Sequence, residues 1–118
     1  MKLMTVLVTG SEGRVGRAVV SELRGHGYRV TPADRSPQHA DDTKVVGMQD
    51  LGQVLGVMQG ENAVVHMAAI PSPGNYAPEV VFRNNVMSTF NIREAATLLG
   101  VQKVVLASSI SCLSAPRI

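Results

Sequence analysis

A chain of 118 residues, 45% of them hydrophobic, is long enough for one domain with a buried core and too short for two. Its formal net charge of +2 is small and its eleven Lys and Arg residues are scattered, so nothing in the sequence supports nucleic-acid binding. A lone cysteine, Cys112, and the absence of any Cys/His cluster with metal-ligand spacing predict no disulfide, no metal site and a reducing, cytoplasmic setting. No apolar run approaches the roughly 20 residues that a bilayer-spanning helix needs, so we expect no membrane insertion.

Four short, valine-rich runs are apolar at consecutive positions, which is typical of strands covered on both faces of a parallel sheet. They occupy residues 5–9, 28–33, 63–68 and 103–107, and a weaker fifth candidate lies at 44–48. Pro32 cannot donate a hydrogen bond to a neighbouring strand, so we expect it near the end of its strand.

Helical spacing of apolar residues separates these runs. The first predicted helix follows residue 14 and stops at the glycines around His26, and a shorter helix is predicted at 50–58. Pro78 suits the start of a third helix, whose inner stripe ends at Gly100. Strands that alternate with helices predict an α/β fold, a Rossmann-type doubly wound parallel sheet, with loops at 36–43 and 71–78.

The stretch TGSEGRVG at 9–16 follows the first predicted strand and opens the first predicted helix. Gly10 permits a sharp turn, Gly13 lets the backbone approach a pyrophosphate, and Gly16 allows the helix to pack closely on the strand. The helix N-terminus, which includes Arg14 and Val15, offers N–H groups and the positive end of a dipole to phosphates. By themselves, three glycines describe a turn without a ligand equally well.

Asp34 ends the second predicted strand, 18 positions past Gly16. A carboxylate at this place can accept hydrogen bonds from both hydroxyls of an adenosine ribose, which favours NAD. Arg35 and Arg14 could instead bind a 2′-phosphate, so NADP stays open. We give Asp34 more weight, because a carboxylate would repel a 2′-phosphate.

Taken in order, these residues resemble the N-terminal part of the extended short-chain dehydrogenases, the NAD-dependent epimerase/dehydratase family. The spacing Gly10-x-x-Gly13-x-x-Gly16 is that family's form. The remaining similarities are to its adenine-contacting pair at Asp50-Leu51, the end of its fourth strand at His66-Met67-Ala68-Ala69, the helix motif NNVMSTFN at 84–91, and the end of its fifth strand at Ala107-Ser108-Ser109.

The resemblance also implies individual roles. Asn84 would contact the cofactor, Asn85 would brace the active-site backbone, and Ser109 would hydrogen-bond the substrate oxygen as a catalytic residue. Asn85 shares a helical face with Ser88, so we expect its amide to point toward the sheet; either asparagine can equally be a structural amide satisfied by main chain. Ser109 can also be a strand-end serine that satisfies loose backbone groups. His66 is predicted to lie mid-strand, and we interpret it as a hydrogen-bonded structural histidine rather than a general base.

For the parent protein, the resemblance implies an NAD-dependent enzyme that transfers hydride at a secondary alcohol of a small-molecule substrate, of the sugar or nucleotide-sugar type. Oxidation, epimerisation and dehydration stay open, as does a homo-oligomer of the full-length parent. The family's chemistry depends on a Tyr-x-x-x-Lys pair after the fifth strand, and neither Tyr28 nor Tyr76 has a lysine four residues later. We therefore expect a sheet truncated after about the fifth strand and a fragment that is itself inactive. The alternative is a non-enzymatic dinucleotide sensor or regulatory module.

Overall fold

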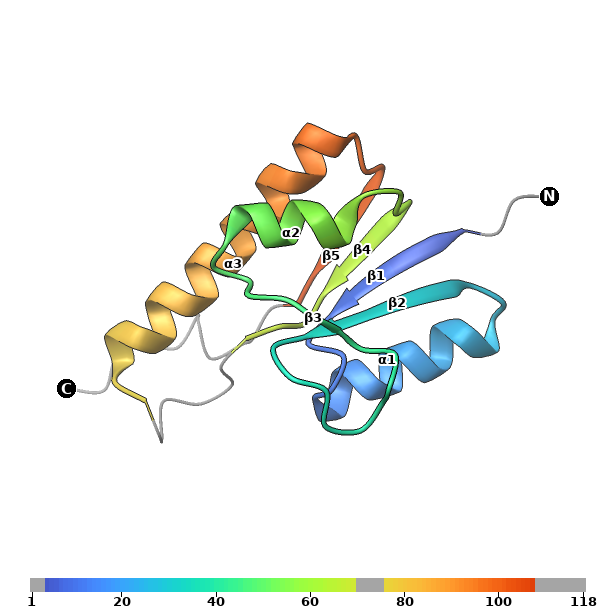
Figure 1. Ribbon diagram of the computed structural model, residues 1–118, viewed down its shortest axis with the longest axis horizontal. Coiled ribbons are helices and arrows are strands. Elements are labelled where there is room, and N and C mark those ends of the chain that lie inside the picture. Colours follow the sequence, from blue (N-terminus) through green and yellow to red (C-terminus); the bar gives the residue numbers. More distant parts are fainter. Residues whose placement is uncertain (1–3, 70–75, 108–118) are drawn as a thin grey trace.

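The computed structural model describes residues 4–69 and 76–107, which form a twisted parallel sheet with helices on both faces (Figure 1). In chain order the elements are β1 (Thr5–Thr9), α1 (Arg14–Gly25), β2 (Arg29–Asp34), β3 (Lys44–Val45), α2 (Leu51–Met58), β4 (Ala63–His66), α3 (Pro78–Leu99) and β5 (Lys103–Leu106). The strand order is β3-β2-β1-β4-β5 and each pairing is parallel. The Rossmann-type doubly wound fold predicted from the sequence is confirmed.

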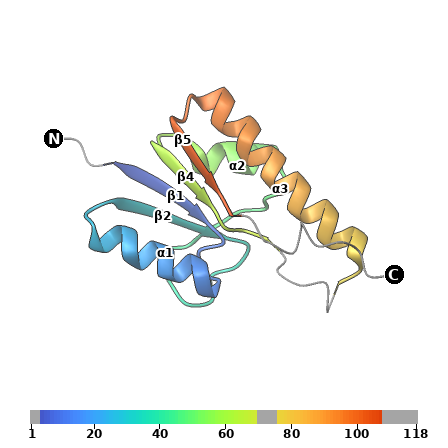
Figure 2. The ribbon, with the colours of Figure 1, turned by 180° about the vertical axis from the view of Figure 1, so that it is seen from behind.

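Two apolar layers hold the helices against the sheet, with α1 on one face and α2 and α3 on the other (Figures 1 and 2). Side chains alternate along β1, so Val6 and Val8 pack toward α1, while Leu7 lies in the cluster of α2 and α3. Leu7 and Ile92 are fully buried in that second cluster. Both faces of β1 are therefore covered, which explains its uninterrupted apolar run.

Local signals explain where the helices end. The Asp50 carboxylate caps α2 by accepting a hydrogen bond from the N–H of Gln53 at 3.3 Å. α3 starts at Pro78, which has no N–H to leave unpaired, and stops at Gly100, whose left-handed backbone (φ 70°) favours glycine. These boundaries match the predicted helices.

Two predicted strand ends were wrong, because at each of them backbone N–H groups bond to a side chain instead of to a neighbouring strand. β3 has two residues instead of five, because the N–H of Gly47 turns away to the side chain of Gln53 at 2.7 Å. β4 ends at His66 instead of 68, so His66 is a strand end rather than a mid-strand residue. Pro32, expected near the end of its strand, is the fourth of the six residues of β2 and is followed there by two residues.

The register of β2 explains why Pro32 is tolerated there. The N–H of Arg29 donates to Met4 O at 3.0 Å, and Ala33 O accepts from the N–H of Ser11 at 3.1 Å, so odd-numbered residues of β2 face β1. Pro32 therefore faces the β3 side, where β3 pairs with residues 33 and 34 only. No ladder hydrogen bond is lost at this position.

Candidate functional site

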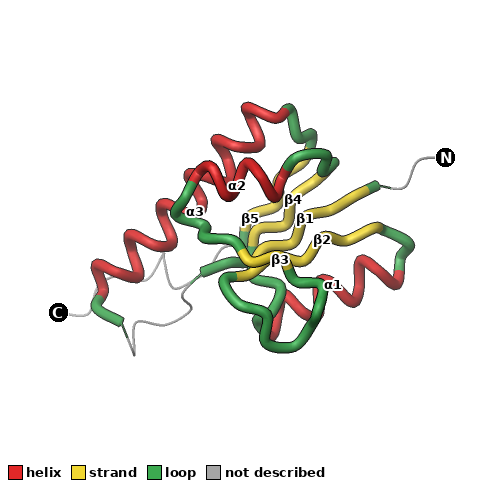
Figure 3. Tube along the Cα trace, viewed as in Figure 1, coloured by secondary structure: helices red, strands yellow, loops and turns green. Residues whose placement is uncertain are grey.

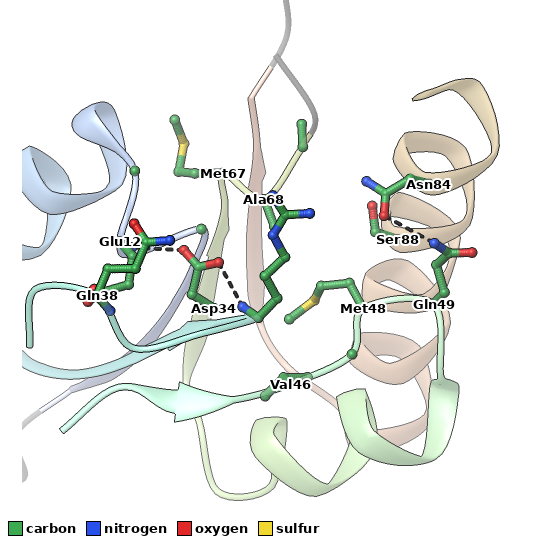
Figure 4. A pocket seen from close by; sticks show the side chains of 15 residues that line it. Glu12, Asp34, Gln38, Val46, Met48, Gln49, Met67, Ala68, Asn84 and Ser88 are labelled. Carbon is green, nitrogen blue, oxygen red and sulfur yellow. Dashed lines mark hydrogen bonds between the residues drawn. The ribbon is translucent and has the colours of Figure 1, made fainter. Parts of the chain in front are cut away.

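A cleft of about 490 Å³ opens at the carboxyl ends of β1, β2 and β4 (Figure 4). The strand order reverses between β1 and β4, and the segments that follow β1 and β2 leave the sheet at the same end (Figure 3). Such a switch point is where open α/β sheets bind ligands. The lining residues are Gly10, Glu12, Gly13, Asp34, Arg35, Gln38, Val46, Gly47, Met48, Gln49, Met67, Ala68, Ala69, Asn84 and Ser88.

The three glycines between β1 and the first turn of α1 have different structural roles. Gly10 has φ +66°, and a Cβ there would lie 2.7 Å from the backbone nitrogen of Ala68. A Cβ on Gly16 would lie 1.9 Å from the carbonyl oxygen of Gly10, so its close packing is against the turn after β1 rather than against the strand itself. Gly13 is exposed, and a Cβ there would meet nothing closer than Gly10 O at 3.4 Å. The fold therefore requires Gly10 and Gly16, whereas Gly13 leaves space in the cleft.

The N-terminus of α1 faces this space. Gly13 is its N-cap and supplies no capping side chain, and the first turn contains no acidic residue. The first N–H groups and the positive dipole end of α1 thus lie beside the cleft. Arg14 and Val15 are exposed and are not among the lining residues, so their cofactor contacts stay predictions.

Asp34 is held with its carboxylate in the cleft (Figure 4). Oδ2 accepts a hydrogen bond from the N–H of Glu12 at 2.9 Å, and Oδ1 accepts one from the N–H of Arg35 at 2.7 Å. Each carboxylate oxygen can accept a further hydrogen bond. The carboxylate is therefore fixed in place while retaining acceptor capacity toward a ligand.

Glu12 is a second carboxylate in the wall of the cleft, and sequence reasoning missed it. Its side chain is buried, 6% exposed, and accepts hydrogen bonds from the N–H groups of Gln38 and His39 and, at 2.8 Å, from the hydroxyl of Thr43. Burial raises the pKa of the Glu12 carboxyl, but the hydrogen bonds from His39, Thr43 and Gln38 lower it by more, so the net pKa is below its usual value. The signal in the sequence was a charged residue between two glycines of a turn.

Thr9 and His66 are a buried polar pair that links the ends of β1 and β4. The Thr9 hydroxyl accepts from the N–H groups of Met67 at 3.0 Å and Ala68 at 3.2 Å and lies 2.7 Å from Nδ1 of His66. With both lone pairs used, the hydroxyl donates to Nδ1, which places the proton of the neutral imidazole on Nε2. Burial lowers the pKa of His66 to about 4, so the ring is neutral at pH 7. His66 is a hydrogen-bonded histidine of the fold, as interpreted from the sequence.

Helix α3 closes the far end of the cleft. Asn84 lines the cleft with Ser88, accepts a hydrogen bond from Gln49 Nε2 at 3.1 Å and donates to Asn85 Oδ1 at 3.0 Å. Asn85, which was expected to point toward the sheet, borders a shallow groove on α3 with Val86, and its orientation toward the sheet stays a prediction.

A buried amide that sequence reasoning missed joins α3 to the cleft wall. Asn91 is 2% exposed and donates to the carbonyl oxygen of Met48 at 2.9 Å. This bond fixes the segment 46–49, which lines the cleft between β3 and α2. The resemblance covered Asn91 as the last letter of a motif, but only the fold shows its partner.

The remaining predicted site residues lie outside the cleft or outside the described residues. The Asp50 carboxylate caps α2, and Leu51 packs against the core, so their adenine contacts stay predictions. Ser109 lies outside the described residues; Ala107 is described, and its N–H donates to His66 O at 3.1 Å. Tyr28 and Tyr76 are exposed and do not line the cleft.

Two classes of site find no support in residues 4–69 and 76–107. No three His, Cys, Asp or Glu side chains in those ranges are grouped in a way that could hold a metal ion. No helix there combines the length and the apolar character that crossing a membrane requires.

Comparison with known proteins agrees with this geometry. The pattern of the NAD dependent epimerase/dehydratase family matches residues 6–116. L-arabinose 1-dehydrogenase (NAD(P)(+)) of Haloferax volcanii is 32% identical over 104 residues, which is 88% of this chain and 40% of that protein. The crystal structure of a short-chain dehydrogenase/reductase superfamily protein from Agrobacterium tumefaciens with bound NAD is 37% identical and superposes with a TM-score of 0.79, covering 90% of this chain and 33% of that one. MoeE5 in complex with UDP-glucuronic acid and NAD is 31% identical with a TM-score of 0.83, covering 96% and 39%.

The chain thus spans about 40% of the length of the first curated relative that it matches. The matched part contains the glycine turn, the Asp34 strand end and the α3 asparagine, which are the elements that build the cleft. This chain belongs to the NAD-dependent epimerase/dehydratase family.

Proposed function

We propose that this chain is the NAD-binding part of an oxidoreductase, epimerase or dehydratase that acts by hydride transfer at a secondary alcohol of a sugar or nucleotide-sugar. The observation that carries the proposal is the cleft at the switch point, where the open space at Gly13 lies between the N-terminus of α1 and the fixed carboxylate of Asp34. The relatives that act on L-arabinose or bind UDP-glucuronic acid support the sugar-type substrate.

Each part of the cleft suits one part of a dinucleotide. The pyrophosphate would lie at Gly13 and the first turn of α1, where N–H groups and the dipole favour anions. The adenosine ribose would lie at Asp34, whose free lone pairs accept from its hydroxyls. The nicotinamide end would extend past Ala68 and Ala69 toward Asn84. NAD then supplies the hydride acceptor, and this chain's residues bind and orient it.

We propose NAD rather than NADP as the preferred cofactor, because Asp34 would repel a 2′-phosphate. Calorimetric titration of the folded protein should give tighter binding of NAD than of NADP. The opposite order would contradict the role of Asp34, and no binding of either would contradict the whole assignment.

Gly13→Ala tests whether the space at Gly13 holds a ligand. The backbone there (φ −73°, ψ 167°) accepts alanine, and the new Cβ would touch the protein no closer than 3.4 Å, so we expect a stability loss below about 1 kcal/mol. In the cleft, the same Cβ would occupy the place of the pyrophosphate and lower NAD affinity by about tenfold or more.

Gly56→Ala is the matched control, because Gly56 is exposed on α2 and a Cβ there would meet nothing within 4 Å. NAD affinity should be unchanged in this variant. Equal NAD affinity for wild type and Gly13→Ala would show that the cleft does not hold the pyrophosphate.

Two observations outside this chain test the enzymatic part of the proposal. A reading frame that continues past Ile118 with a Tyr-x-x-x-Lys pair, and a protein that forms NADH from an aldose or a nucleotide-sugar, would support the enzyme. Binding of NAD without such a pair would favour a dinucleotide sensor.

A further inference from the structure

Glu12 makes contacts that the proposed pyrophosphate and ribose contacts do not require. Glu12 is buried, and its carboxylate accepts hydrogen bonds from two kinds of donor. These are the backbone N–H groups of residues 38 and 39 and the side-chain hydroxyl of Thr43. A buried carboxylate is costly unless its lone pairs are used, and here three donors use them. The arrangement is therefore built around the ionised form.

These contacts fix the chain that follows β2. Residues 35 and 38 of this segment line the cleft beside Asp34. A second tether, the ion pair between Arg24 and Asp42 at 2.7 Å, joins the same segment to α1, but both side chains are about half exposed. Exposed ion pairs contribute little to stability, so Glu12 is the stronger of the two anchors.

Glu12 also brings a second negative charge to the ribose end of the cleft. Its own N–H donates to Asp34 Oδ2 at 2.9 Å, so the two residues are in direct contact (Figure 4). Both residues line the cleft, and neither carboxylate pairs with an arginine side chain within the described residues. A 2′-phosphate placed against Asp34 would be repelled by both anions, whereas a 2′-hydroxyl could donate a hydrogen bond to Asp34.

We propose that Glu12 is a specificity-determining and positioning residue of the nucleotide site, which anchors the segment 35–43 as the wall of the ribose end and, as an anion beside Asp34, excludes a 2′-phosphate. The inference rests on the proposed binding of NAD in this cleft. It predicts that the preference for NAD over NADP is shared between two carboxylates and is not set by Asp34 alone.

Glu12→Gln separates charge from shape. The amide oxygen can still accept from the N–H groups of residues 38 and 39, and the amide NH₂ can donate to the Thr43 hydroxyl, so the anchor is kept. We expect the ratio of the NADP to the NAD dissociation constant, measured by calorimetry, to fall about fivefold while NAD affinity stays within about twofold. Glu22→Gln, an exposed charge removal on α1, is the control and should leave the ratio unchanged.

Glu12→Ala removes the anchor as well. Trypsin should then cleave after Arg35 faster than in wild type, measured by mass spectrometry under native conditions, because the segment loses three hydrogen bonds. Thr43→Val keeps the charge and removes one of the three bonds, so it should raise cleavage after Arg35 without changing the cofactor ratio.

The outcomes distinguish this inference from the proposed function. If wild type binds neither cofactor, the proposed function fails, while the cleavage rates still test the anchor. If wild type binds NAD but Glu12→Gln leaves the NADP-to-NAD ratio unchanged, the charge role of Glu12 is refuted. If Glu12→Ala is folded and is cleaved after Arg35 at the wild-type rate, the anchor role is refuted.

Discussion

The buried His66 makes the stability of this fold sensitive to acid, and His66→Asn should remove that sensitivity. Burial lowers the pKa of His66 from 6.5 to about 4, so between these values the unfolded chain binds a proton that the folded chain does not. The contribution of neutral His66 to the free energy of unfolding is therefore fully present above pH 6.5 and is lost as the pH falls toward 4. From pH 7 to pH 4.5, linkage with these two values gives a loss of about 2 kcal/mol.

The variant keeps the local hydrogen bond while losing the titration. Asn Oδ1 can accept from the Thr9 hydroxyl in place of Nδ1, which lies 2.7 Å from that oxygen in the wild type. Urea unfolding followed by far-UV circular dichroism suits this chain, which has no tryptophan for fluorescence. Carboxyl groups titrate in both proteins, so the difference between wild type and variant isolates His66.

The exposed His26 at the end of α1 provides the control, and His26→Asn should show the wild-type pH dependence. If His66→Asn loses as much unfolding free energy as wild type between pH 7 and pH 4.5, the ring is not held neutral by burial. The reasoning about the Thr9–His66 pair would then be refuted.

Three further substitutions test the packing around the cleft, with urea unfolding as the measurement. Gly16→Ala should cost about 3 kcal/mol or prevent folding, because its Cβ would lie 1.9 Å from Gly10 O; a loss below about 1 kcal/mol would contradict the contact. Thr9→Val should cost about 1–3 kcal/mol by leaving the N–H of Ala68 without its acceptor, and unchanged stability would argue against that bond. Burial raises the pKa of Glu61 more than its hydrogen bond from a threonine lowers it, so Glu61→Gln should be more stable than wild type at pH 7. That advantage should shrink as the pH falls toward 4.5 and vanish below it, where the carboxyl is protonated in both states, and an advantage that persists there would point to another cause.

The strands of the sheet were readable from the sequence because both of their faces are buried. Leu7 and Val8 pack on opposite faces, so neither face required polar alternation and the apolar run stayed continuous. The strand ends were harder, because β4 stops where N–H groups bond to the hydroxyl of Thr9 instead of a neighbouring strand. A threonine at position 9 gives no local sign of which distant amides it will accept.

Some residues of the candidate site could likewise be predicted from the sequence and others could not. Gly10 and Asp34 were predictable because a turn glycine and a strand-end carboxylate act through their own position in a β-α-β unit. Glu12 and Asn91 were not, because each acts on a segment far away in the sequence: 26 residues on to Gln38 for Glu12, and 43 residues back to Met48 for Asn91. Long-range side-chain to backbone bonds have no periodicity that a sequence pattern could display.

The cleft is shaped by side chains that accept backbone N–H groups. Thr9 fixes the end of β4, Asp34 fixes the glycine turn, and Glu12 fixes the segment after β2. Because the protein's own backbone already uses these acceptors, the cleft has its form before any ligand arrives, which lowers the ordering cost of binding. A substitution that removes one of these acceptors must therefore alter stability and binding together, so its effect on affinity is interpretable only beside an unfolding measurement. Gly13 is the exception, because no close contact within the described fold requires a glycine there. If Gly13→Ala lowers NAD affinity without changing stability, the effect reports directly on the bound ligand.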